Sequence, residues 1–288
     1  MLEVLDTISD PGHPLKPNED ALGHGPRHAW VIDGATGVAE GELLDAPTDA
    51  HWLAGAASDF FAEHAQTHGA DLAALTRRAI EDLASRFEAE RTRPLDGRHE
   101  LPSAAMTLVH SDGKYIHCVN FADCRLILQD EDGGVTVLGD NHLDREAASR
   151  RRTAELVQRI APGADMRSSP EVMAHLRAAR ARQNTDDGYW ILGLDPRAVD
   201  FMRSWTVPLK GAVTGLLMSD GFASLAYDYG RMTPAELAAE AHEKGLAAIV
   251  EAIRKIEREE DPDMRAYPRF KRSDDATALL FRVDPARA

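Results

Sequence analysis

Four segments of this 288-residue chain place carboxylates beside apolar stretches that read as strands. A carboxylate just beyond a buried strand is held by a rigid scaffold and still reaches solvent. Several such strand ends at one edge would crowd negative charges, which is unfavourable unless protons or cations neutralise them. Oxygen-only clusters suit hard ions such as Mg²⁺ or Mn²⁺. The four segments are Asn18-Glu19-Asp20, Val31-Ile32-Asp33-Gly34, Met218-Ser219-Asp220-Gly221 and Ser273-Asp274-Asp275.

The Asp-Gly pairs have a second interpretation, because Asp-Gly is common in ordinary turns. Asp112-Gly113 and Asp132-Gly133 lie between short strand-like runs and are interpreted as hairpin turns. Gly34 and Gly221 would allow a tight turn after a strand, and the Gly34 carbonyl is itself a candidate ligand. Spacing alone therefore leaves both a metal site and simple turns open.

The elements that must position these carboxylates alternate between strands and helix pairs. Apolar residues at helical spacing predict helices, and short runs bounded by turn residues predict strands. Strands are predicted at Glu3–Ile8, His28–Ile32, Ser103–His110, Tyr115–Asn120, Arg125–Gln129, Val135–Leu138, Val213–Met218 and Ala276–Val283. Helices are predicted at Asp49–His68, Asp71–Arg91, Arg145–Ile160, Pro170–Arg182, Thr233–Lys244 and Leu246–Glu259. The successive short strands favour an antiparallel sheet. Without repeats or linkers, residues 1–288 are predicted to form one domain.

Composition narrows the class of protein. With 33 Lys plus Arg against 48 Asp plus Glu, the net charge of −15 argues against nucleic acid and anionic membrane surfaces as partners. No run of about 18 apolar residues predicts a membrane span, and the N-terminus does not resemble a secretory signal. Two cysteines, Cys118 and Cys124, fit a reducing compartment, so a cytoplasmic location is expected.

One segment, Asp144–Arg182, runs against the overall charge. It holds nine arginines and five acidic residues, a net charge of +4. A basic segment could attract a phosphorylated or acidic substrate. The alternative is an ordinary solvated helix face with ion pairs along it.

Taken in order, five motifs resemble those of the metal-dependent protein phosphatases of type 2C, the PPM family, in its bacterial form. The motifs are Asn18-Glu19-Asp20-Ala21, Val31-Ile32-Asp33-Gly34-Ala35-Thr36-Gly37, Phe121-Ala122-Asp123-Cys124-Arg125, Leu217-Met218-Ser219-Asp220-Gly221-Phe222 and Asp274-Asp275-Ala276-Thr277-Ala278-Leu279-Leu280. The resemblance implies an α+β fold, in which two antiparallel sheets form a sandwich flanked on each side by a helix pair. A helical flap insertion would occupy residues of about 140–210.

The resemblance also implies a site and a reaction. Two Mg²⁺ or Mn²⁺ ions would sit at the sandwich edge, with Asp33 bridging both and the Gly34 carbonyl binding one. Asp220 and Asp274 would hold the other, and Glu19 and Asp20 would act largely through metal-bound water. The reaction would be hydrolysis of phosphomonoesters, on phosphoserine or phosphothreonine of proteins, by attack of a metal-bridging water.

Several positions depart from the family pattern. The His proposed as general acid in animal members is Ala35 here, and the phosphate-binding Arg is absent because position 15 is Leu. Lys16 is the candidate substitute as a point charge. The resemblance leaves a third ion open, because Asp123 matches one of its ligands whereas Ser224 stands at the other acidic position.

The residues on their own agree on the class of mechanism. The chain has no Cys-x5-Arg nucleophile loop, no Asp-x-Asp-x-Thr nucleophile and no Gly-x4-Gly-Lys phosphate loop. Three hypotheses stay open: a protein phosphatase with a phosphoprotein substrate and a partner kinase, the same fold acting on a small phosphorylated metabolite or nucleotide, and a catalytically silent signalling module.

Overall fold

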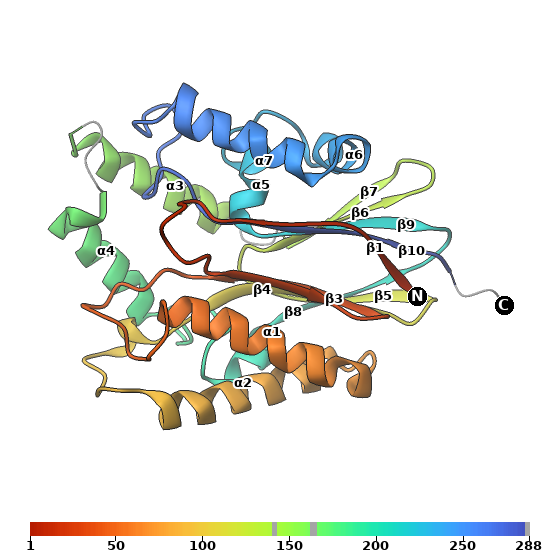
Figure 1. The fold of residues 1–288 in the computed structure, drawn as a ribbon, viewed down its shortest axis with the longest axis horizontal. Coiled ribbons are helices and arrows are strands. Elements are labelled where there is room, and N and C mark those ends of the chain that lie inside the picture. The colour runs from red at the N-terminus through yellow and green to blue at the C-terminus, as the bar shows by residue number, and fades with distance from the viewer. Residues whose placement is uncertain (140–142, 162–165, 286–288) are drawn as a thin grey trace.

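The fold is an α+β sandwich of two five-stranded sheets, seen edge-on in the computed structural model of Figure 1. The structure describes residues 1–139, 143–161 and 166–285, and the side chains of 143–146 lie outside that description. Three residues of the +4 segment, Asp144, Arg145 and Glu146, therefore lack described side chains, and Asp165 lies outside the described residues altogether.

Each sheet is antiparallel throughout. The first has the order β1-β10-β9-β6-β7 and the second the order β2-β3-β4-β5-β8. The strands of the first sheet are β1 Leu2–Asp10, β10 Ala276–Val283, β9 Val213–Met218, β6 Arg125–Asp130 and β7 Val135–Leu138. Those of the second are β2 Asp20–His24, β3 His28–Gly34, β4 Ala104–Ser111, β5 Tyr115–Phe121 and β8 Arg203–Pro208. The predicted sandwich is confirmed.

Helices cover the outer face of both sheets, and two more lie at one end (Figure 1). The second sheet carries α1 Asp49–His68 and α2 Leu72–Glu90. The first carries α5 Asp220–Tyr227, α6 Pro234–Lys244 and α7 Leu246–Lys255, which continues as a π-helical turn over Ile256–Glu260. The end helices are α3 Leu143–Gln158 and α4 Pro170–Ala181. Short 3₁₀ turns cover Arg98–Glu100, Met166–Ser168 and Pro196–Phe201.

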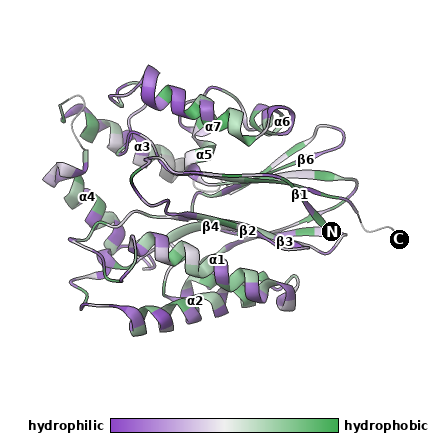
Figure 2. Cartoon of the chain, viewed as in Figure 1, coloured by the Kyte–Doolittle hydropathy of each residue, from purple (hydrophilic) through white to green (hydrophobic). Residues whose placement is uncertain are grey.

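The core follows from the alternation of side chains along strands that are buried on both faces. In β3, Trp30 and Ile32 pack towards α1 and α2, whereas Ala29 and Val31 face the opposite sheet. Phe281 of β10 lies in that same inter-sheet layer. Figure 2 shows hydrophobic residues along the strands and on the inner sides of the helices. This packing fixes the strand ends that carry the acidic residues.

Three elements were missed from the sequence, and each has a physical reason. β2 is short, contains Gly23 and is only half-buried. β8 pairs only with β5 and is largely exposed. α5 begins at Asp220, almost directly after β9. In the sequence its first residues were therefore interpreted as part of the Ser219-Asp220-Gly221 turn rather than as a helix. The expected helix pair is present on the first sheet as α6 and α7, and α5 packs there beside it as a third helix.

No helix among the described residues is long and apolar enough to cross a membrane.

Candidate metal centre

The predicted acidic residues come from both sheets at one edge of the sandwich. Asp20 begins β2 and pairs in register with Asp33 near the end of β3. Asp220 follows the end of β9, and Asp274 lies two residues before the start of β10. Because β9 and β10 are antiparallel neighbours, the end of one lies beside the start of the other. The backbone NH of Asp220 donates to Oδ2 of Asp33 across the two sheets, at 3.4 Å.

The carboxylates affect one another's ionisation. Burial, with the charge of Asp220, holds the pKa of Asp33 well above its usual range. Burial, with the charge of Asp274, does the same for the pKa of Asp220. Burial and the charges of Asp275 and Asp274 raise the pKa of Asp20 to about 7. The carboxylates therefore repel one another when they are ionised. A bound cation would offset this repulsion, so the cluster favours binding of positive ions.

Two buried carboxylate oxygens support this reading. Oε1 of Glu19 and Oδ2 of Asp20 are buried without a hydrogen-bond partner in the described part of the chain. Buried polar atoms are rarely left unpaired in proteins, and an ion or water is a common explanation. The other Glu19 oxygen, Oε2, accepts a hydrogen bond from the hydroxyl of Thr36. These oxygens fit the donor chemistry of Mg²⁺ or Mn²⁺.

Side chains alone do not form a closed cage. Within residues 1–139, 143–161 and 166–285, no three acidic, histidine or cysteine side chains converge on one point closely enough to hold an ion. The predicted ligand set differs from such a cage, since it includes the Gly34 carbonyl and water at Glu19 and Asp20. A centre completed by a backbone carbonyl and water is supported by the raised pKa values of Asp33 and Asp220 and by the unpaired oxygens of Glu19 and Asp20.

Backbone close approaches hold the loops at this edge. The Gly34 NH donates to the Glu19 carbonyl at 3.0 Å, and a Cβ at Gly34 would lie 2.3 Å from that oxygen. A Cβ at Gly221 would lie 2.0 Å from the carbonyl oxygen of Asp275. The Asp275 carboxylate accepts the backbone NH of Glu19 at 2.7 Å and that of Gly12 at 2.9 Å. Asp275 thus ties the loop before β2 to the loop before β10.

The two tentative site residues lie in different surroundings. Asp123 follows β5, and its charge contributes to the raised pKa of both Asp33 and Asp220. Ala122, at the family's Gly position, has a φ of 57°, a left-handed conformation that costs a non-glycine residue about 1–2 kcal/mol. Lys16 is exposed in the loop between β1 and β2, and its side chain makes no ion pair within the described residues. The roles of Asp123 and Lys16 stay predictions.

A lysine that sequence reasoning missed lies at the centre. Nζ of Lys271 is 2.7 Å from Oδ1 of Asp274. Although burial opposes it, this ammonium group lowers the pKa of Asp274. The charges of Glu19 and Asp33 also act on Lys271, so it is within electrostatic range of the whole cluster. Its position three residues before a motif Asp was a signal in the sequence.

Arginines of α4 and of the 3₁₀ turn before it dock on the loop that follows Asp33-Gly34. They bind three successive backbone carbonyls: Arg180 binds that of Thr36 at 3.0 Å, Arg167 that of Gly37, and Arg177 that of Val38 at 3.0 Å. Thr36 therefore links α4 to Glu19, because its carbonyl accepts from Arg180 and its hydroxyl donates to the Glu19 carboxylate. The excess of arginine in Asp144–Arg182 is visible in the sequence, but neither interpretation of its +4 charge included this contact, because a run of backbone carbonyls carries no sequence pattern.

The chain is similar to known proteins in sequence and in fold. The family model described as protein phosphatase 2C matches residues 15–265. Among curated proteins none matches the chain.

Among solved structures, the serine/threonine phosphatase PstP/Ppp of Mycobacterium tuberculosis has a TM-score of 0.56 and 15% identity, over 98% of this chain and 99% of that one. The PstP catalytic domain in complex with two manganese ions has a TM-score of 0.54 and 18% identity, over 99% and 100%. The PPM phosphatase MsPP of Mycobacterium smegmatis, in complex with cacodylate, has a TM-score of 0.54 and 17% identity, over 97% and 98%.

These identities are low, so the structural likeness shows the shared fold. The family model covers most of the chain and all but the last of the five motifs. The chain belongs to the protein phosphatase 2C family of Mg²⁺- or Mn²⁺-dependent phosphatases.

Proposed function

We propose that the carboxylates at this edge hold two Mg²⁺ or Mn²⁺ ions for hydrolysis of phosphoserine or phosphothreonine in proteins. Asp33 would serve both ions, the Gly34 carbonyl one of them, and Asp220 and Asp274 the other. The observation that carries the proposal is the convergence of buried, mutually repelling carboxylates from both sheets. Bound divalent ions would neutralise charge on the phosphoryl group and make a bound water more acidic.

The chain's own groups have separate tasks in this proposal. Glu19 and Asp20 carry the unpaired buried oxygens and would hold water near the ions. Thr36 and Asp275 fix the orientation of Glu19. The Thr36 hydroxyl donates to the Glu19 carboxylate, and the Asp275 carboxylate accepts the Glu19 backbone NH. Because position 35 is Ala, the leaving group would take its proton from water rather than from a histidine.

Hydrolysis of p-nitrophenyl phosphate with and without Mn²⁺ tests the reaction class. We expect Mn²⁺-dependent turnover that falls by about 100-fold or more in Asp33→Asn and Asp220→Asn, because several kcal/mol of charge stabilisation would be lost. Asp132→Asn is the matched control, since Asp132 is exposed in the β6–β7 turn. Unchanged turnover in both site variants would exclude the proposed centre.

Substrate class requires a second comparison. We expect a higher kcat/KM for phosphothreonine peptides than for a panel of small phosphorylated metabolites and nucleotides. The opposite order would assign the same centre to a metabolite. A protein substrate would also imply a partner kinase that places the phosphate this enzyme removes.

A further inference from the structure

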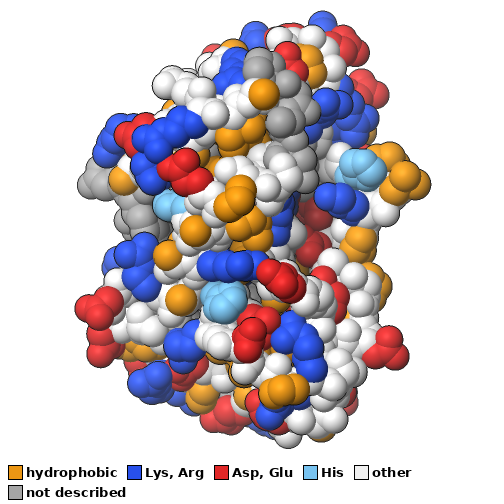
Figure 3. Space-filling model, turned by 90° about the vertical axis from the view of Figure 1, so that its left-hand side faces the viewer, with side chains coloured by type: hydrophobic (Ala, Val, Ile, Leu, Met, Phe, Trp, Pro, Cys, Tyr) orange, Lys and Arg blue, Asp and Glu red, His pale blue; other side chains and the backbone are white. Residues whose placement is uncertain are grey.

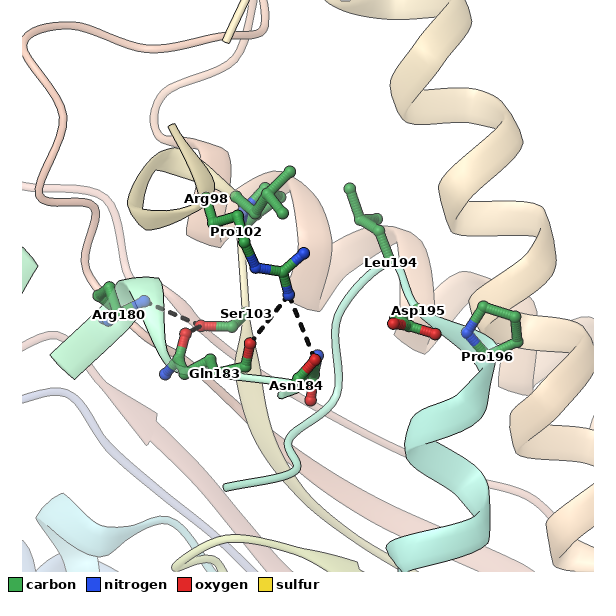
Figure 4. A pocket seen from close by; sticks show the side chains of 10 residues that line it. Arg98, Pro102, Ser103, Arg180, Gln183, Asn184, Leu194, Asp195 and Pro196 are labelled. Atoms are coloured by element: carbon green, nitrogen blue, oxygen red, sulfur yellow. Dashed lines mark hydrogen bonds between the residues drawn. The ribbon is translucent and has the colours of Figure 1, made fainter. Parts of the chain in front are cut away.

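A pocket lined by both charged and apolar side chains opens beside the loop that follows Asp33-Gly34. Its volume is about 260 Å³, against roughly 30 Å³ for one water, so it can take a side chain. Figure 4 shows the Arg98 guanidinium within the ring of side chains that lines it. The lining residues come from the segment before β4, the end of α4 and the segment 194–196; they include Arg98, Ser103, Arg180, Asn184 and Asp195.

The pocket holds more positive than negative charge. Its two cations, Arg98 and Arg180, bond only to neutral acceptors among the hydrogen bonds described. Arg98 donates through Nη2 to the carbonyls of Gln183 and Asn184, at 3.1 and 3.2 Å. Its Nε and Nη1 have no hydrogen-bond partner in the part of the chain that the structure describes. Three N–H donors of a rigid fork thus stay available to an anion.

Arg180 is also bound by neutral oxygens. It donates to the hydroxyl of Ser103 at 2.8 Å and to the carbonyl of Thr36 at 3.0 Å. The single carboxylate of the pocket, Asp195, is held by Arg197 at 2.6 Å. A pocket with two cations and one already neutralised acid favours a negatively charged occupant.

The pocket adjoins the metal centre through shared residues. The carbonyl of Ser103 accepts the backbone NH of Ala35, two residues after Asp33, at 2.9 Å. Arg180 interacts electrostatically with Glu19 and Asp33 as well as lining the pocket. A phosphopeptide with its phosphate at the carboxylates would therefore place a neighbouring residue near Arg98.

A second pocket adjoins the first. It has a volume of about 240 Å³, shares Arg98 and Asn184 with the first and adds Thr185, Asp186, Trp190 and Arg197, so its added charges are one acid and one base. Trp190 stacks on the half-exposed ring of Phe201, with ring centroids 4.0 Å apart. Figure 3 shows basic, acidic and hydrophobic side chains interspersed at this end of the molecule. An extended peptide would find both a charged and an aromatic contact here.

We propose that the pocket of Arg98 and Arg180 binds an anionic group of the substrate protein, beside the phosphoresidue, and so selects acidic phosphorylation sites. The anionic group is the carboxylate of Asp or Glu, or a second phosphate. This inference rests on the proposed function, because it names the substrate class of the same centre.

The test uses the full chain loaded with Mn²⁺ and phosphothreonine peptides that are identical except at one position. Glu, Ala, Lys or phosphoserine is placed at each position in turn on both sides of the phosphothreonine. At one position we expect Glu to raise kcat/KM about tenfold over Ala, as for a charge-assisted hydrogen bond. The phosphoserine arm shows which of the two anions the pocket prefers.

Variants of Arg98 decide whether the pocket causes this selectivity. In Arg98→Ala the Glu-to-Ala ratio should fall to near one. Arg98→Glu should reverse it, so that Lys at that position becomes the better substrate. This reversal cannot come from local unfolding where Arg98 meets the end of α4. Arg151→Ala removes one exposed arginine of α3 and should keep the wild-type ratio. An unchanged ratio in Arg98→Ala, or no preferred position in the wild type, would overturn the inference.

A binding measurement separates this inference from the proposed function. Fluorescence anisotropy of the same peptides with metal-free protein reports the pocket without turnover. Binding to the metal-free protein that prefers Glu and depends on Arg98, together with no peptide hydrolysis by the Mn²⁺-loaded protein, would support the pocket and reject a protein phosphatase. Peptide hydrolysis by the Mn²⁺-loaded protein without any Glu preference would support the proposed function and reject the pocket.

Discussion

Lys271 donates a 2.7 Å hydrogen bond from its ammonium group to Oδ1 of Asp274, a predicted metal ligand. The chain thus supplies its own cation to a cluster whose other members, Asp33 and Asp220, have raised pKa values. A lysine at this point must compete electrostatically with a divalent ion that uses the same carboxylate.

Replacing Lys271 should therefore strengthen metal binding. In Lys271→Met we expect Mn²⁺ to bind about tenfold more tightly by titration calorimetry, which corresponds to about 1.4 kcal/mol. Lys244→Met is the matched control, because Lys244 makes a 2.7 Å ion pair with Glu240 on α6. Weaker or unchanged Mn²⁺ affinity in Lys271→Met would show that Lys271 does not compete with the ion.

Close backbone contacts at the centre predict that alanine substitution destabilises the protein at Gly34 and Gly221, in contrast to Gly55 in α1. Gly34→Ala and Gly221→Ala should each lower the free energy of unfolding by about 2–3 kcal/mol, because the added Cβ meets fixed carbonyl oxygens of Glu19 and Asp275. Gly55→Ala in α1 has open space around it and should raise stability by about 0.5–1 kcal/mol. Urea unfolding of metal-free protein measures all three. Equal effects at the three positions would contradict the contacts.

A pair of buried histidines predicts a loss of stability in acid. His28 and His110 are adjacent on β3 and β4, with Nε2 and Nδ1 3.0 Å apart, and both are buried. Burial lowers the pKa of His28, and burial with the charge of His28 lowers the pKa of His110 to about 4. The folded state therefore favours neutral rings. Their contribution is complete above pH 6.5 and is lost as the pH falls towards 4.

Thermal or urea unfolding between pH 7 and pH 4 measures this effect. His110→Phe, which cannot be protonated, should lose about 2 kcal/mol less stability over that range than the wild type. His24→Asn changes an exposed histidine at the end of β2 and should follow the wild-type profile. The same pH dependence in wild type and His110→Phe would contradict the role of the pair.

The sequence predicted most of the sandwich because its central strands are long apolar runs. β3 and β4 are buried along nearly their whole length, and their composition signals this directly. β2, β8 and α5 escaped prediction because edge strands and short helices depend on tertiary contacts rather than on their own patterns. Gly23, for example, lies in β2 although glycine is disfavoured in strands, so the local sequence argues against the strand that forms.

At the site, the order of motifs predicted which carboxylates lie together. Strand pairing between Asp20 and Asp33, and between β9 and β10, then brought them to one edge. Lys271 and Arg180 were not predicted, because they reach the centre through the conformation of the loop before β10 and the placement of α4. Arg180 acts on a backbone carbonyl, and any residue could supply that acceptor.

The central claim is that these carboxylates bind divalent ions, and Mn²⁺ titration calorimetry of Asp33→Asn tests it most directly. The wild type should bind Mn²⁺, and Asp33→Asn should bind it at least about 100-fold more weakly, because the neutral amide removes the charge shared by both ions. Asp132→Asn should bind as the wild type does. Wild-type Mn²⁺ affinity in Asp33→Asn would contradict the account.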